Sequence, residues 1–121
     1  MSAPFLGLAL KQAARSRCRY RVGAVLARGS RVLGGSANLQ RNPPHVDFRH
    51  ATFHAEEAVL RRVVCPRGAT AYVARLGRDG SPLMARPCWR CQRALTARGV
   101  VRVHYTTPQG AGVMLLADPG C

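Results

Sequence analysis

The sequence predicts an α/β protein with three layers, in which a five-stranded mixed sheet is flanked by helices. One observation is that segments with helical spacing of apolar residues alternate along the chain with short β-favouring runs. Another is the order of these segments, helix-strand-strand-helix-strand-helix-strand-strand, which combines a hairpin with crossover helices. Such an order gives one sheet with helices packed on its faces.

The length and composition are those of one domain. The chain has 121 residues, of which 47% are hydrophobic, enough to fill one core. We therefore expect a single domain over residues 1–121. No apolar stretch approaches the roughly 18 residues of a membrane span, and no secretory signal is recognised. With five cysteines, an odd number, we expect reduced thiols and a cytoplasmic protein that makes no membrane contact.

The first half of the chain supplies a helix and a hairpin. Apolar residues recur at helical spacing after Pro4, which predicts a helix over about residues 4–17. The β-favouring runs 20–27 and 31–36 flank a short glycine-containing connection, as two antiparallel strands do. The stretch 38–53 has no periodicity, so we expect a long loop there, of a kind that is often functional.

The second half alternates helices with strands. A helix with two acids in its first turn, where the helix dipole favours them, precedes a buried-type strand and a loop over 77–87. The next helix is stopped by Gly99, and a glycine-rich turn at 110–112 separates the last two strands. The predicted elements are helix 54–64, strand 69–76, helix 88–98, strand 100–106 and strand 113–117.

The charge is extreme for a chain of this size. The 19 Lys and Arg residues against 5 Asp and Glu residues give a formal net charge of +14, which predicts attraction to phosphate groups. The basic residues are dispersed, and the one dense run, 15–21, alternates with other residues. A solvated basic surface, a mononucleotide and a nucleic acid therefore all remain interpretations of this charge.

Two short motifs carry the chemistry, His-x-Glu at 54–56 and Pro-Cys-x-x-Cys at 87–91, each at the start of a predicted helix. A catalytic Zn²⁺ needs three protein ligands and an open position, and imidazole and thiolate suit it. Cysteines three residues apart at a helix N-terminus point the same way, where the dipole favours thiolates. The motifs predict Zn²⁺ held by His54, Cys88 and Cys91.

Glu56 completes the predicted catalytic site. One neutral imidazole and two thiolates balance the charge of Zn²⁺, and such a site lowers the pKa of a bound water toward neutrality. Glu56, two residues beyond His54, is near enough to that water to act as a proton shuttle. A purely structural zinc site needs no such residue.

The cysteines are open to other interpretations. A lone Cys-x-x-Cys is also typical of a thioredoxin-like redox pair, or of half a structural zinc knuckle. The remaining cysteines, Cys18, Cys65 and Cys121, supply no second Cys-x-x-Cys with which to complete a knuckle. The pairing of both motifs, with a strand predicted between them, favours the catalytic site.

Together, His54-Ala55-Glu56 and the segment from Pro87 to Cys91 resemble the signature of the zinc-dependent nucleobase deaminases of the cytidine and deoxycytidylate deaminase-like superfamily. The resemblance covers nearly the whole chain and implies a three-layer cytidine deaminase-like fold that deaminates cytosine to uracil. Free-cytidine deaminases usually carry cysteine where His54 stands, which favours the deoxycytidylate, tRNA-adenosine and polynucleotide-editing branches. In contrast, no long helix follows the fourth predicted strand, so the fifth strand is expected to return as a hairpin. That arrangement resembles cytidine deaminases and not the editing branches.

The resemblance and the motif positions also suggest substrate contacts. Asn38 is expected to bind the sugar, with a turn residue as the alternative. The aromatic residues beside the ligands are expected to stack on the base, with packing in the core as the alternative. The arginines are expected to lie near a 5′-phosphate, with exposed and solvated charges as the alternative. The candidate substrate-binding residues are Asn38, Arg41, Phe53, Ala55, Arg86, Pro87, Trp89 and Tyr105.

The leading hypothesis is zinc-dependent hydrolytic deamination of cytosine in a free nucleoside or nucleotide, above all deoxycytidylate, by a homo-oligomer. A second hypothesis is deamination of cytosine or adenine in single-stranded DNA or RNA, which the charge favours and the short uncharged loop after Tyr105 disfavours. A third is a basic nucleic-acid-binding module with a structural zinc ion.

Overall fold

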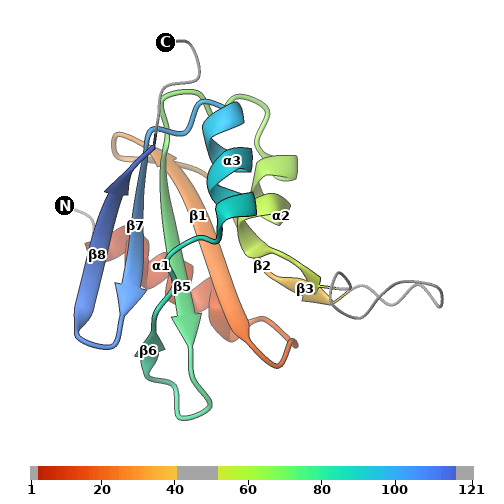
Figure 1. Ribbon diagram of the computed structural model, residues 1–121, viewed down its shortest axis with the longest axis vertical. Helices are drawn as coiled ribbons and strands as arrows, with labels where there is room; N and C mark the ends of the chain where they lie inside the picture. Colours follow the sequence, from red (N-terminus) through yellow and green to blue (C-terminus); the bar gives the residue numbers. More distant parts are fainter. Residues whose placement is uncertain (1–2, 41–51, 117–121) are drawn as a thin grey trace.

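The computed structural model describes residues 3–40 and 52–116 (Figure 1). The helices are α1 (Ala3–Ala14), α2 (Ala55–Arg62) and α3 (Trp89–Ala97). The strands of the main sheet are β1 (Arg21–Arg28), β2 (Arg31–Ala37), β5 (Thr70–Leu76), β6 (Pro82–Leu83), β7 (Arg102–Thr107) and β8 (Gly110–Leu115). Strands β3 (Leu39–Gln40) and β4 (Thr52–Phe53) pair with each other in a separate two-stranded sheet.

The main sheet is mixed. Its strand order is β2-β1-β5-β7-β8, with β6 added beside the end of β5. Strand β1 is antiparallel to both neighbours, β5 and β7 are parallel, and β8 returns antiparallel to β7. The parallel pair is joined through α3, because parallel strands require a crossover connection. The predicted five-stranded mixed sheet is confirmed, and so is the hairpin return of its last strand.

Helices cover both faces of the sheet. On one face Leu6 of α1 packs with Val25 and Tyr72. On the other, a larger core cluster joins Val59 of α2 and Leu95 of α3 to the sheet. Figure 1 shows α1 behind the sheet and α2 and α3 in front of it, which confirms the three layers. Among the described residues, no helix has the length and apolar character needed to cross a membrane.

The contact between α1 and β1 depends on Gly23. A Cβ atom at this position would lie 2.2 Å from the carbonyl oxygen of Ala9 and 2.3 Å from the backbone nitrogen of Ala13. Both neighbours are backbone atoms of α1, which cannot move without displacing the helix. Glycine therefore sets how closely the helix approaches the sheet.

Helix α1 is shorter than predicted, because it ends at Ala14 instead of residue 17. The N–H groups of Arg15 and Ser16 donate to carbonyls three residues back, which tightens the last turn. The Ser16 hydroxyl then donates to Asn38 Oδ1 over 2.6 Å. This bond holds the segment between α1 and β1 against Asn38, the residue that follows β2.

Strand β8 begins at Gly110, where the glycines of 110–112 had predicted a turn. The turn is made by Pro108 and Gln109, and Gly112 lies inside the strand opposite Tyr105. A Cβ atom at Gly112 would come within 2.4 Å of the Tyr105 ring, so this glycine leaves space for an aromatic side chain. The predicted loops 38–53 and 77–87 contain the short strands β3, β4 and β6.

Candidate metal centre

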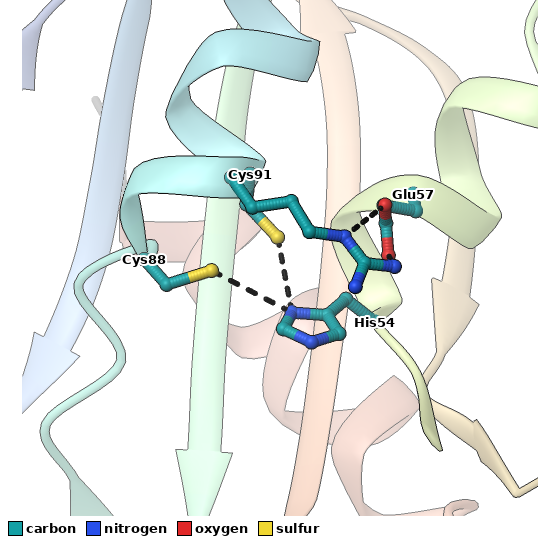
Figure 2. Close-up of polar contacts among 5 residues, drawn as sticks. His54, Glu57, Cys88 and Cys91 are labelled. Carbon is teal, nitrogen blue, oxygen red and sulfur yellow. Dashed lines mark hydrogen bonds and ion pairs between the residues drawn. The ribbon is translucent and has the colours of Figure 1, made fainter. Parts of the chain in front are cut away.

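The three predicted metal ligands come together where α2 and α3 begin (Figure 2). His54 is the N-cap residue of α2 and Cys88 that of α3, both with extended backbone angles, and neither side chain caps its own helix. Cys91 lies in the first turn of α3, on the same side as Cys88, because residues three apart are neighbours on a helix surface. The imidazole and both thiols therefore face one another.

The distances and the donor atoms fit a tetrahedral zinc ion. His54 Nδ1 lies 3.1 Å from Cys91 Sγ and 3.8 Å from Cys88 Sγ, and the three ligand atoms lie within 4.8 Å of one another. Typical Zn–N and Zn–S bonds at tetrahedral angles separate nitrogen from sulfur by about 3.5 Å. One imidazole and two thiols are also donors that Zn²⁺ prefers. Three protein ligands leave one coordination position open, as catalytic zinc sites do.

The environment of the thiols couples metal binding to proton release. Burial raises the pKa of the Cys91 thiol well above its usual range, and the neighbouring Glu56 carboxylate raises it further. A protonated thiol cannot ligate zinc, so its proton must leave when the ion binds. The N-terminus of α3 adds positive potential that favours the thiolates.

Glu56 lines a cavity beside the predicted ligands, which we call the site cavity. The cavity has a volume of about 240 Å³ and is lined by Tyr20, Val22, Asn38, His54, Ala55 and Glu56. The Glu56 side chain is only 5% exposed. This burial raises the pKa of its carboxyl group, although its backbone hydrogen bond, the charge of His54 and a hydrogen bond from the Cys91 thiol act in the opposite direction. The sequence had offered Tyr20 and Val22 only as strand residues.

Asn38 lies in the wall of this cavity, and most of its side chain is already bonded to the protein. Its Oδ1 accepts hydrogen bonds from the Ser16 hydroxyl over 2.6 Å and from the Val22 N–H over 3.0 Å. Its Nδ2 donates to the Tyr20 carbonyl over 2.6 Å. An amide nitrogen has two hydrogens, so the second remains for a ligand.

The other residues predicted beside the ligand motifs lie at different depths. Ala55 is fully buried and lines the site cavity. Pro87 is also buried, and its carbonyl accepts a hydrogen bond from Gln92 Nε2 over 2.8 Å. Arg86 is exposed and is not among the described residues that line the cavity. Arg41 lies outside the residues that the structure describes.

The predicted aromatic residues are dispersed. Trp89 is 71% exposed and lines a different cavity, of about 370 Å³, together with Leu115 of β8. Tyr105 packs over Gly112. Phe53 pairs with Leu39 in the small sheet, and its side chain lies outside the described part of the chain. The structure therefore shows neither Trp89 nor Tyr105 lining the site cavity.

An ion pair between the two ligand helices was missed by the sequence analysis. Arg90 Nε and Nη2 donate to the two carboxylate oxygens of Glu57 over 2.9 and 2.7 Å (Figure 2). At the other end of the same helices, Arg98 donates to the carbonyls of Leu60 and Val63 over 3.0 and 2.9 Å. These contacts fix α2 against α3. In the sequence, an acid follows the first motif and an arginine lies within the second, which could have suggested an ion pair. The sequence does not show, however, that the two helices are neighbours.

A cluster of three possible zinc ligands beside a buried glutamate, in a three-layer α/β fold, fits a zinc enzyme that activates a bound water. Residues 3–107 match the family model described as the cytidine and deoxycytidylate deaminase zinc-binding region. The chain therefore belongs to the cytidine and deoxycytidylate deaminase family. Enzymes of this family are zinc-dependent hydrolytic deaminases. Zn²⁺ is therefore the cofactor, and His54, Cys88 and Cys91 form a cluster that could hold it.

Individual proteins are similar over most of the chain. The deoxycytidylate deaminase of Mycobacterium phage D29 is 32% identical over an alignment of 127 positions that covers 84% of this chain and 90% of the relative. The cytidine deaminase of Mycobacterium tuberculosis has a TM-score of 0.57 and 26% identity, covering 88% of this chain and 84% of that one. The dCMP deaminase of cyanophage S-TIM5 in complex with dCMP and dUMP has a TM-score of 0.60 and 18% identity, covering 86% and 79%. The last likeness is one of fold alone.

Proposed function

We propose that the protein deaminates cytosine in a free nucleotide, above all deoxycytidylate, to give deoxyuridylate and ammonia. The observation that carries this proposal is that buried Glu56 and the metal ligand His54 line one cavity, with both cysteine ligands facing that histidine. The choice of deoxycytidylate is supported by the similarity to the phage D29 enzyme, which carries the name deoxycytidylate deaminase. We also propose that residues 1–121 act as one domain.

The reaction replaces the C4–N4 bond of cytosine by a C4–O bond. Zinc, when bound, lowers the pKa of a water ligand toward neutrality and so supplies the nucleophile. The Glu56 carboxylate accepts the proton of the attacking water, delivers it to N3 of the ring, and then transfers a proton to the departing ammonia. A raised pKa suits this task, since the carboxyl must hold the proton between the two transfers.

The cavity wall orients the substrate. We propose that the remaining Nδ2 hydrogen of Asn38 donates to a sugar hydroxyl, while the bonds from Ser16 and to Tyr20 fix the orientation of the amide. Ala55 also lines the cavity, where its small apolar side chain leaves room for the base. These uncharged contacts favour the reaction by holding the substrate close to the reacting groups in a fixed orientation.

A second candidate substrate is cytosine or adenine in single-stranded nucleic acid, which the net charge of +14 favours. The turn after β7 argues for the smaller substrate, because Pro108 and Gln109 form a short, uncharged connection with little surface for a polymer. The membership in a deaminase family excludes a binding module that keeps zinc only for stability.

The test is a panel of substrates given to the zinc-loaded protein. Cytidine, deoxycytidine, their monophosphates, adenosine and a short single-stranded oligonucleotide are incubated separately, and the products are identified by absorbance and mass. Fastest turnover of deoxycytidylate is the expected result. Turnover of the oligonucleotide alone would show that the substrate is a polynucleotide. Turnover of none of the cytosine compounds would refute the proposal.

A further inference from the structure

A second cavity lies next to Tyr20, a residue that also lines the site cavity. It has a volume of about 400 Å³, and its lining includes three arginines, Arg19, Arg75 and Arg78. Tyr20 lines both cavities. No carboxylate is found among the described residues that line the second one. The arginine cavity, as we call it, is therefore a positively charged space beside the place where the base would react.

Arg75 stands on the same face of the sheet as the metal centre. It lies on β5 opposite Val22 of β1, and cross-strand partners project to the same side of a sheet. Val22 lines the site cavity and packs against the core cluster under α2 and α3. The Arg75 side chain thus leaves the sheet on the face that carries the metal centre, at the end of β5 that continues into Gly77 and Arg78.

Within residues 3–40 and 52–116, no carboxylate forms an ion pair with the guanidinium groups of the arginine cavity. The Arg75 guanidinium lies 4.9 Å from the centre of the Tyr20 ring, and that of Arg19 lies 5.7 Å from it. Arg75 Nε is buried without a hydrogen-bond acceptor among the described residues. The nearby Asp79 carboxylate accepts from the N–H and hydroxyl of Ser81 over 3.0 and 2.6 Å. Two cations on one ring, with an unused buried donor, match an anion with several acceptor oxygens.

The segment that separates the two cavities is held at both ends. The Tyr20 carbonyl accepts from Asn38 Nδ2 over 2.6 Å, which ties it to the wall of the site cavity. Arg21 Nη2 donates to the Gly77 carbonyl over 2.6 Å, which ties the same segment to the turn that carries Arg78. The spacing between the base site and the arginines is therefore built into the fold.

We propose that Arg19, Arg75 and Arg78 form the subsite that holds the phosphate group of the nucleotide substrate, with Tyr20 as the partition between phosphate and base. The proposal rests on the proposed function, since it places the base beside Glu56 and the sugar beside Asn38. Planar guanidinium groups bind phosphate oxygens in pairs, which suits a terminal phosphate with three of them.

The test compares substrates that differ only in the phosphate. The ratio of kcat/KM for deoxycytidylate to kcat/KM for deoxycytidine is measured in wild type, in Arg75→Gln and in Arg78→Gln. We expect the ratio to fall about tenfold or more in each variant, through a higher KM for the nucleotide, with turnover of deoxycytidine unchanged. Arg78 lies in an exposed turn, so its substitution leaves the core intact. Arg31→Gln, which removes the same charge from the far end of the β1–β2 hairpin, is the control and is expected to change nothing.

A second readout does not depend on turnover. Inorganic phosphate should raise the Tm of the wild-type protein and of Arg31→Gln, and should fail to raise that of Arg75→Gln, because a ligand that binds only the folded state stabilises it. Equal losses of activity toward deoxycytidylate and deoxycytidine would overturn the subsite and leave the proposed function standing. Phosphate binding that needs Arg75, without turnover of either compound, would refute the proposed function and retain the anion site. Loss of activity toward an oligonucleotide alone would assign the arginines to a polymer, against the proposal.

Discussion

Two adjacent glutamates at the start of α2 have different environments, and the difference assigns them different tasks. Glu56 is buried against the site cavity, where its carboxyl group has a hydrogen bond from the Cys91 thiol and is subject to the charge of His54. Glu57 is turned outward and forms the bidentate pair with Arg90. In sequence the two are equivalent acids in a first helical turn, and only the packing separates the catalytic role proposed for Glu56 from the structural role of Glu57.

Glu56→Gln should therefore abolish turnover while sparing the metal. We expect kcat/KM to fall by about 10³-fold or more, because the amide cannot carry the proton, and zinc content to stay unchanged. The measurement is steady-state kinetics beside elemental analysis. Glu57→Gln is the matched control and should remain within about threefold of wild type, since it loses only an exposed ion pair. Near-normal activity in Glu56→Gln would eliminate the proposed mechanism.

Cys88→Ser should lose the metal. Wild type is expected to hold about one Zn²⁺ per chain, and loss of one thiolate leaves too few soft donors for tight binding. Elemental analysis after dialysis measures the content, and a pH indicator measures the protons released when zinc is added back. Cys65→Ser removes an exposed cysteine away from the cluster and should keep full zinc. Full zinc in Cys88→Ser would contradict the ligand assignment.

Glycines in neighbouring elements respond in opposite ways to the same substitution. Gly23→Ala should lower the free energy of unfolding by about 3 kcal/mol, because the new methyl group meets the backbone of α1. Gly7→Ala should raise it by about 0.5–1 kcal/mol, since nothing lies within 4 Å of the added atom and alanine favours the helix. Urea unfolding at saturating zinc measures both. A stable Gly23→Ala would show that α1 can shift off the sheet.

Elements with their own periodicity could be predicted from the sequence, and elements that exist only through pairing could not. Helices α2 and α3 begin and end within two residues of the predicted 54–64 and 88–98. The two-residue strands β3, β4 and β6 have no internal pattern, because each depends on a partner distant in the chain.

The same limit applies to the candidate site. The clustering of His54, Cys88 and Cys91 was predictable, because zinc coordination favours particular residue types at particular spacings. The aromatic contacts were not. Trp89 follows Cys88 directly, but successive helical residues turn by about 100°, so it leaves α3 in another direction and lies near Leu115. The arginine cavity gathers residues from two distant segments, which no local motif signals.

The charge of the whole molecule, +14, makes salt dependence the sharpest test of substrate size. Raising salt from about 50 to about 200 mM should lower kcat/KM for deoxycytidylate by less than about tenfold, because a single phosphate releases few counterions. A single-stranded polymer that contacted about five arginines would lose about a hundredfold, with a slope near −0.7 per contact. Kinetics at several salt concentrations measure the slope. A steep slope with an oligonucleotide, and no turnover of deoxycytidylate, would favour the polymer.

Loss of zinc would lower the stability of this protein as well as its catalytic activity. His54 and Cys88 begin α2 and α3, and each turns its side chain toward the other instead of capping its own helix. A helix start that has neither a capping side chain nor a bound ion frays, and frayed segments are open to proteases. A cell starved of zinc would therefore hold less of the enzyme, and a chelator added during purification would lower its yield.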